Sequence, residues 1–188
     1  MLQYVLAFLA GILVKTVDWI EDDLKSKTPL KYLLAIAYGA IIGYLISVAP
    51  FSTIFLAAII GQVFAKKFDT AAHMLGLFAT ILTIPLFGFP PLDLLLLGYF
   101  VVLAFLDELE YAGNLWFLER YRPFLKVGAL PLLFLGKWEY FAGIILFDLG
   151  YELVYAITGR MGKKESSAPE PKAPEAIARQ KARRLKSS

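Results

Sequence analysis

The stretch that decides the fold is YLLAIAYGAIIGYLISVAPFSTIFLAAIIGQVFA, which occupies residues 32–65 and contains no charged side chain. A helix that crosses a membrane needs about 20 apolar residues, because each residue adds ~1.5 Å and the hydrocarbon core is ~30 Å thick. The stretch is therefore too long for a single span. Because proline interrupts a helix, Pro50 is expected to divide it into two helices, Leu30–Val48 and Phe51–Ala65, joined as a tight hairpin.

Four further apolar runs lie on either side of this hairpin. They are Leu2–Trp19, Thr70–Phe87, Leu92–Leu106 and Tyr140–Thr158. The whole chain is 59% hydrophobic, whereas a soluble domain is about half apolar. The sequence therefore predicts an all-α fold, a polytopic integral membrane helical bundle with six clear transmembrane helices in the cell membrane.

A seventh segment, Phe124–Gly136, is apolar apart from Lys126 but short for a span, so it is either a thin or tilted helix or a re-entrant segment. The positive-inside rule favours a crossing. If this segment crosses, the basic residues of the loops at 21–31, 66–69 and 109–126 share one face with the C-terminal tail. Only Lys137 then lies opposite. We therefore expect the N-terminus outside and the tail in the cytoplasm.

The basic charge of the chain belongs to its last residues. Residues 1–160 contain 11 Lys and Arg against 13 Asp and Glu, whereas residues 161–188 contain 8 against 3. We predict a transmembrane domain over 1–160 and a largely disordered tail over 161–188, because the tail is rich in Ser, Pro, Ala and Glu. This tail either contacts anionic lipid or an acidic partner, or it is a solvated segment that only fixes orientation.

The remaining composition excludes some chemistry. The chain has no cysteine, so it has neither a disulfide framework nor a thiolate metal site. The motifs GxSxG, HExxH, GxxxxGK[ST] and GxGxxG do not occur in it. Asn114 is its only asparagine, and this scarcity of thermolabile side chains is typical of thermophilic proteins.

The last predicted span carries the strongest candidates for a functional site. Asp148 and Glu152 are four residues apart, so they share a helix face that Tyr155 continues. An ionisable group at membrane depth costs ~2.5–3.5 kcal/mol, so it normally faces protein or water. Two neighbouring carboxylates repel unless they share a proton or bind a cation. The pair is therefore either an ion- or proton-binding site or part of a structural network with basic and tyrosine side chains.

Two acidic clusters lie at the predicted cytoplasmic boundary. Asp18 and Asp22 share a face with Lys15, and Asp107 shares one with Glu110. Clustered carboxylates suit a divalent cation such as Mg²⁺, but charges at span ends are also ordinary boundary markers. His73, the only histidine, follows Asp69 by four residues, so the two are expected to pair, for proton transfer or as an interfacial contact.

Small residues recur at the spacing that lets helices pack closely. Gly39 and Gly43 form a GxxxG pattern, and Ala57 with Gly61 forms a related one. These faces pack either within the chain or between the subunits of a homo-oligomer.

Three functions follow from these features. The first is a transporter or channel for a cation or a cation-coupled solute, through Asp148 and Glu152. The second is a membrane-embedded, Mg²⁺-dependent enzyme that acts on a lipid phosphate held by Arg120 and Arg122. The third is a non-catalytic membrane subunit or scaffold whose basic tail recruits a partner. A cavity that gathers the carboxylates favours the enzyme, and a polar path past Asp148 favours transport.

Overall fold

The computed structural model describes residues 1–109, 118 and 121–166, and the regular structure of these residues is entirely helical. The chain divides into two compact units, residues 1–155 and 156–188. The first unit carries the helices that build the site, and only this unit is described below.

The described residues contain seven α-helices and one π-helical turn, joined by loops. The helical elements are α1 (Leu2–Asp18), η1 (Trp19–Asp23), α2 (Leu30–Ile46), α3 (Phe51–Phe64), α4 (Ala71–Phe87), α5 (Leu94–Asp107), α7 (Pro123–Phe134) and α8 (Trp138–Ser166). The all-α class predicted from hydropathy is thus confirmed. The predicted break at Pro50 is also found, because α2 ends at Ile46 and α3 begins at Phe51.

The segment of uncertain character, Phe124–Gly136, forms the helix α7. Proline occupies the first helical position, where its missing N–H costs nothing. A second proline, Pro131, lies inside the helix. Leu135 and Gly136 close its last turn, and Gly136 adopts φ 72°, a left-handed conformation that glycine tolerates. α7 is therefore a helix in its own right, whereas its crossing of a membrane stays a prediction.

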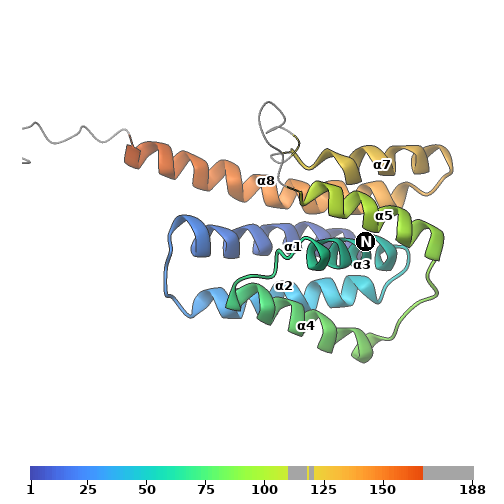
Figure 1. Cartoon of the computed structure of the whole chain (residues 1–188), viewed down its shortest axis with the longest axis horizontal. Coiled ribbons are helices and arrows are strands. Elements are labelled where there is room, and N and C mark those ends of the chain that lie inside the picture. Colours follow the sequence, from blue (N-terminus) through green and yellow to red (C-terminus); the bar gives the residue numbers. More distant parts are fainter. Residues whose placement is uncertain (110–117, 119–120, 167–188) are drawn as a thin grey trace, which may run out of the picture. The chain divides into compact units, whose positions relative to one another are not determined.

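Successive helices of the first unit run in alternating directions (Figure 1). The end of α1, the start of α2, the end of α3 and the start of α4 lie at one end of the unit, and the turn between α2 and α3 lies at the other. The charged residues that follow α1 and α3, together with Arg122 immediately before α7, therefore lie at the same end.

Glycines let the helices approach backbone to backbone. A Cβ atom at Gly39 would overlap the carbonyl oxygen of Gly76, and one at Gly43 would lie 2.7 Å from the carbonyl oxygen of Thr80, so α2 packs directly on α4. Gly61 brings α3 equally close to Ala104 of α5. Ala57 is fully buried between the same helices.

The small-residue faces are therefore occupied by helices of the same chain. A homo-oligomer, which stays a prediction, would have to use other surfaces. The same close approach joins α1 to α8, where Gly11 meets the backbone of Phe147 and Gly150 meets that of Phe8.

Aromatic rings fill the middle of the unit. The ring of Phe51, which is fully buried, meets Tyr4 edge-on with 5.1 Å between centroids and stacks on Phe55 at 6.1 Å. Phe55 in turn meets Phe147 of α8 at 6.0 Å. Such contacts contribute about 0.5–1.5 kcal/mol each beyond the burial of area. They fix α1, α3 and α8 relative to one another below the charged end.

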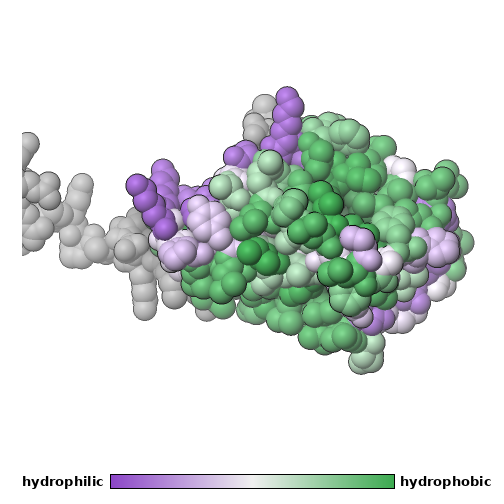
Figure 2. Space-filling view, turned by 90° about the horizontal axis from the view of Figure 1, so that it is seen from below, coloured by the Kyte–Doolittle hydropathy of each residue, from purple (hydrophilic) through white to green (hydrophobic). Residues whose placement is uncertain are grey.

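The outward faces of the helices are apolar. Figure 2 shows hydrophobic residues over most of one face of the molecule, with hydrophilic residues gathered toward its ends. Large exposed side chains include Leu33, Phe78, Leu86, Leu95 and Phe134, with exposed fractions from 56% to 92%. Two stretches, Leu2–Asp23 and Trp138–Gly159, are long and apolar enough to cross a membrane, and five shorter helices are also apolar.

The glycine contacts give a test of the packing. Because a Cβ at Gly11 would overlap the carbonyl oxygen of Phe147, Gly11→Ala should force α1 away from α8 and lower the free energy of unfolding by about 1–3 kcal/mol. Gly98→Ala is the matched control, because nothing lies within 4 Å of its added methyl group. The midpoint of thermal unfolding in detergent should fall for the first variant only. Equal midpoints would show that α1 and α8 do not meet at Gly11.

Candidate functional site

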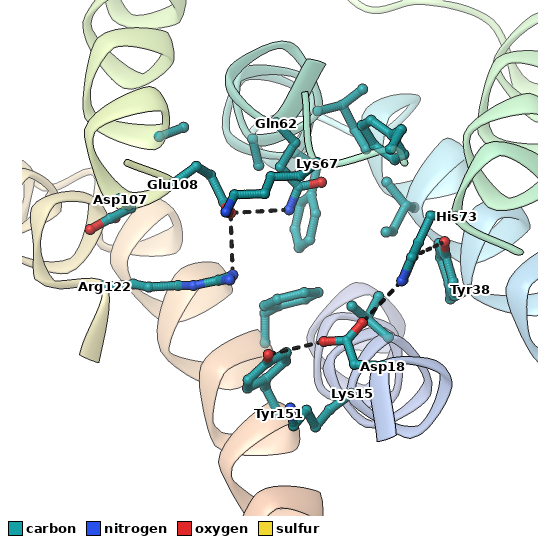
Figure 3. A pocket seen from close by; sticks show the side chains of 18 of the residues that line it. Lys15, Asp18, Tyr38, Gln62, Lys67, His73, Asp107, Glu108, Arg122 and Tyr151 are labelled. Carbon is teal, nitrogen blue, oxygen red and sulfur yellow. Dashed lines mark hydrogen bonds and ion pairs between the residues drawn. The ribbon is translucent and has the colours of Figure 1, made fainter. Parts of the chain in front are cut away.

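A cavity of about 420 Å³ lies at the charged end of the first unit, among its seven described α-helices and the short segment before α4 (Figure 3). The part of the cavity near the charged end carries charged and polar side chains, and the part farther from that end is lined by apolar side chains. Four residues that the sequence singled out as ionic candidates line it, namely Asp18, Asp22, Asp107 and Asp148. Arg122, predicted to hold phosphate, lines it as well.

Asp18 is the centre of a hydrogen-bonded chain across the cavity wall. The Tyr151 hydroxyl donates to its Oδ2 at 3.0 Å, and Nε2 of His73 lies 3.2 Å from its Oδ1. The other ring nitrogen of His73, Nδ1, lies 3.0 Å from the Tyr38 hydroxyl. The helices α4 and α8 thus bind α1 through a single carboxylate, and α2 joins the chain through His73 (Figure 3). Both oxygens of Asp18 are therefore engaged.

The partner of His73 differs from the one expected. Asp69 was predicted to pair with it four residues on, but α4 begins at Ala71 and Thr70 is its N-cap, whose hydroxyl accepts from the His73 N–H at 3.3 Å. Asp69 therefore precedes the helix, where four-residue spacing no longer places two side chains on one face. The histidine ring instead meets Asp18, which no local pattern could identify.

On the wall of the cavity opposite Asp18, Glu108 binds two side chains. Its side chain is only 7% exposed, and its Oε1 lies 3.2 Å from Nη1 of Arg122. Nε2 of Gln62 donates to the same oxygen at 3.4 Å. Glu108 was not singled out, because helical spacing placed it on a different face from Asp107. α5 ends at Asp107, so the helical rule stops there and both residues line the cavity.

Arg122 is directed into the cavity by its backbone as well as by Glu108. It precedes α7 in the left-handed region, at φ 42° and ψ 64°, which is uncommon for a residue other than glycine. Its guanidinium carbon lies 5.6 Å from the centre of the Tyr151 ring. Burial opposes the charge, but Glu108, with Tyr151 and Asp18 nearby, holds the pKa of Arg122 above its ordinary value. Arg122 is therefore a fixed cation.

Asp107 has a structural task. Its two oxygens accept the backbone N–H groups of Phe124 and Leu125, each at 2.8 Å. These are among the first N–H groups of α7, which have no partner within the helix. Asp107 thus caps a helix to which it is not adjacent in sequence, and it fixes the start of α7 next to Arg122.

Asp148 is paired with a cation. Its Oδ2 lies 2.9 Å from Nζ of Lys126, and both side chains are partly buried. Glu152, one helical turn further along α8, is not among the residues that line the cavity. Lys15 lies above the rings of Tyr151 and Tyr155, with 5.0 and 5.7 Å between its Nζ atom and their centroids. An ion site at Asp148 and Glu152 stays a prediction.

The mouth of the cavity is formed by exposed charged residues. Asp22 follows α1, and Lys67 and Asp69 lie in the segment between α3 and α4. None of these three makes an ion pair within the part of the chain that the structure describes. Among the described residues Lys67 has no ion-pair partner, so its ammonium group is a point charge with three N–H donors at the entrance.

The deeper walls are apolar. Ile42, Ile54, Leu77, Ile144 and Phe147 line them, and they come from α2, α3, α4 and α8. Thr80 is the polar residue at this depth, and its hydroxyl is hydrogen-bonded to the backbone oxygens of Gly39 and Gly76 at 3.1 and 3.0 Å. The deep part of the cavity thus offers no side-chain hydrogen-bonding group that is not already engaged among the described residues.

Three of the predicted features lie wholly or partly outside the described residues. Arg120 and Glu110 lie outside the described residues, as do residues 167–188 of the basic tail. Among the residues that are described, no group of three or more His, Asp or Glu side chains is arranged to hold a metal ion. A divalent cation such as Mg²⁺ therefore stays a prediction. No family model, curated protein or solved structure matches this chain.

The capping role of Asp107 can be tested against a second cap. Asp93 accepts the N–H groups of Leu95 and Leu96 at 3.1 Å at the start of α5, but it is exposed. Removing a capping side chain costs about 0.5–2 kcal/mol, and the buried cap should lie at the upper end because water cannot replace it. Asp107→Ala should therefore lower the unfolding midpoint in detergent more than Asp93→Ala. An equal or smaller loss would contradict the capping role.

Proposed function

We propose that this chain is a multi-pass membrane protein whose cavity binds a lipid phosphate, as the substrate site of a membrane-embedded enzyme. The observation that carries the proposal is that one cavity joins a ring of cations and hydrogen-bond donors to an apolar chamber. An amphipathic molecule with an anionic head has the same two parts.

The apolar surface supports the membrane setting. Hydrophobic residues cover most of the face seen in Figure 2, and large apolar side chains such as Leu33, Phe78 and Leu95 are exposed. Soluble monomers rarely expose contiguous apolar patches of more than a few hundred Å². The two long helices match the thickness of a bilayer. The shorter helices of 12–17 residues reach about 18–25 Å, a mismatch that local thinning of the bilayer accommodates.

The cations of the cavity suit a phosphate. Arg122 engages Glu108 through Nη1, and a guanidinium group has further N–H donors, which can bind phosphate through two parallel hydrogen bonds. Lys67 stands at the mouth as a point charge, and Lys15 lies on aromatic rings rather than on a carboxylate. The carboxylates Asp18, Asp107, Glu108 and Asp148 are each held by hydrogen bonds or cations, which reduces their repulsion of an anionic head.

The apolar depth favours a lipid phosphate over a transported cation. A cation needs oxygen ligands along its path, whereas the cavity passes from Asp148 to isoleucine and phenylalanine side chains. A scaffold needs no cavity of this size. A Mg²⁺ ion, if one takes part, would be held by one or two carboxylates together with phosphate oxygens, and the exposed Asp22 and Asp69 stand at the mouth for that role.

Binding can be tested with decyl phosphate, decanol and inorganic phosphate on protein in neutral-lipid nanodiscs. Decyl phosphate should raise the unfolding temperature, because a ligand of the folded state stabilises it, and decanol should have a much smaller effect. Lys67→Gln should weaken the affinity about tenfold, since a hydrogen bond to a charged group contributes ~1.5–3 kcal/mol. Arg122→Gln should weaken it at least as much.

Lys137→Gln is the matched control, because Lys137 follows α7 at the end remote from the cavity. It should bind like the wild type. Inorganic phosphate binding as tightly as decyl phosphate would indicate a site for free phosphate. No binding of either, or equal losses at Lys67 and Lys137, would contradict the proposal.

The orientation can be tested because the chain contains no cysteine. In the proposed topology the cavity faces the cytoplasm, so Lys66 and Lys137, both exposed, lie on opposite sides of the membrane. Single substitutions Lys66→Cys and Lys137→Cys in sealed cells should give opposite results with a membrane-impermeant maleimide. Only Lys137→Cys should be labelled from outside. Labelling of both from one side would contradict the seven-span arrangement.

A further inference from the structure

The cavity ends on a floor of isoleucine side chains. Ile42 of α2, Ile54 of α3 and Ile144 of α8 line its deepest part, with exposed fractions of 5%, 3% and 9%. Ile42 lies about one turn before the end of α2, Ile54 lies in the first turn of α3 and Ile144 lies in the second turn of α8, so all three lie toward the end of the unit opposite the charged end (Figure 1). Each belongs to a core cluster. This floor is therefore held in place by the fold.

The helical rise gives the distance from the ring of cations and hydrogen-bond donors, taken at Gln62 and Tyr151, to the isoleucine floor. Ile54 precedes Gln62 by eight residues, and Ile144 precedes Tyr151 by seven. The apolar part, below Tyr38 and Asp148, is the lower ~6 Å of a cavity that is about 10–12 Å deep on both helices at ~1.5 Å per residue. An extended chain advances ~1.2 Å per bond, since three bonds span at most ~3.6 Å, so the full depth of the cavity corresponds to about ten carbon atoms.

The walls between ring and floor select what can enter. A water molecule needs two to four polar partners, and the chamber below Asp148 and Tyr38 presents apolar side chains together with a threonine hydroxyl already bonded to backbone. Alkyl groups are the chemistry that such walls favour, at about 25 cal/mol per Å² of apolar surface buried.

We infer that the apolar chain of the ligand enters the chamber lengthwise, and that Ile42, Ile54 and Ile144 set the longest chain accepted, at about ten carbon atoms. The inference rests on the proposed lipid-phosphate site. The isoleucine floor can limit the length of the alkyl chain only if the cations of the cavity bind the phosphate group. It goes beyond that function because it names the substrate class as phosphates of short, single chains.

Two substitutions should move the limit in opposite directions. Ala58 lines the cavity one helical turn, about 6 Å, above Ile54 on the same face of α3. Ala58→Phe should therefore raise the floor and shift the preference toward shorter chains by about five carbon atoms. Ile144→Ala removes part of the floor and should extend the preference toward longer chains.

The experiment measures the affinity of butyl, hexyl, octyl, decyl, dodecyl and hexadecyl phosphate for the full chain in neutral-lipid nanodiscs. Wild-type affinity should rise with chain length up to about decyl and then fall or level off, because longer chains no longer fit. Ala58→Phe should peak near hexyl, and Ile144→Ala should gain at dodecyl relative to the wild type. Leu149→Ala, an exposed position on the same helix as Ile144, is the matched control and should keep the wild-type profile.

The outcomes separate this inference from the proposed function. If alkyl phosphates bind with a dependence on Lys67 but the profile rises steadily to hexadecyl in all variants, the floor does not measure the chain and only the inference fails. If no alkyl phosphate binds the wild type, both fail. Ala58→Phe fills the chamber and Ile144→Ala enlarges it, and the unfolding midpoint of each variant shows whether it folds. If one variant misfolds, the other still tests the inference. A shift that Leu149→Ala reproduces would also overturn the inference.

Discussion

The cost of burying a charge among apolar helices governs this structure. A carboxylate that loses water without gaining a partner is destabilised by several kcal/mol, so each buried carboxylate at the charged end has found one. Asp18 takes His73 and Tyr151, Glu108 takes Arg122 and Gln62, Asp148 takes Lys126, and Asp107 takes two backbone N–H groups. These partners come from different helices, so satisfying the charges also ties the helices together around one space.

Close packing elsewhere makes that space possible. Gly39, Gly43 and Gly76 let α2 lie directly on α4, and Gly11 with Gly150 does the same for α1 and α8. Side chains of ordinary size would hold these pairs at the usual separation of 8–10 Å. At the charged end, by contrast, long side chains such as Lys126, Arg122 and Tyr151 line the cavity. The bundle is thus tight where glycine occurs and hollow where the charges meet.

The sequence was sufficient for the helices and insufficient for most of the site. Hydropathy and Pro50 located α2 and α3 to within a few residues, because an uncharged run and a helix breaker are local signals. Pairing is not local. Asp18 and Tyr151 are 133 residues apart, and nothing in the sequence near either one identifies the other. Four-residue spacing even suggested the wrong partner for His73, because the start of α4 at Ala71 removed Asp69 from the helix.

The gathering of carboxylates was nonetheless foreseeable in outline. Alternating helices must return every second charged segment to the same end, so Asp18, Asp22 and Asp107 were expected at one boundary before their partners were known. Hydropathy could not show whether a ligand bound at this boundary is a cation or an anion. Counted along the sequence, the acidic residues point to a cation, whereas in space each buried carboxylate already has a donor. Among the described residues, the cations Arg122, Lys67 and Lys15 still have N–H donors without a carboxylate partner, and they lie above an apolar chamber. The order in depth, cations above and isoleucines below, is what makes an anionic amphiphile the ligand that fits both parts at once.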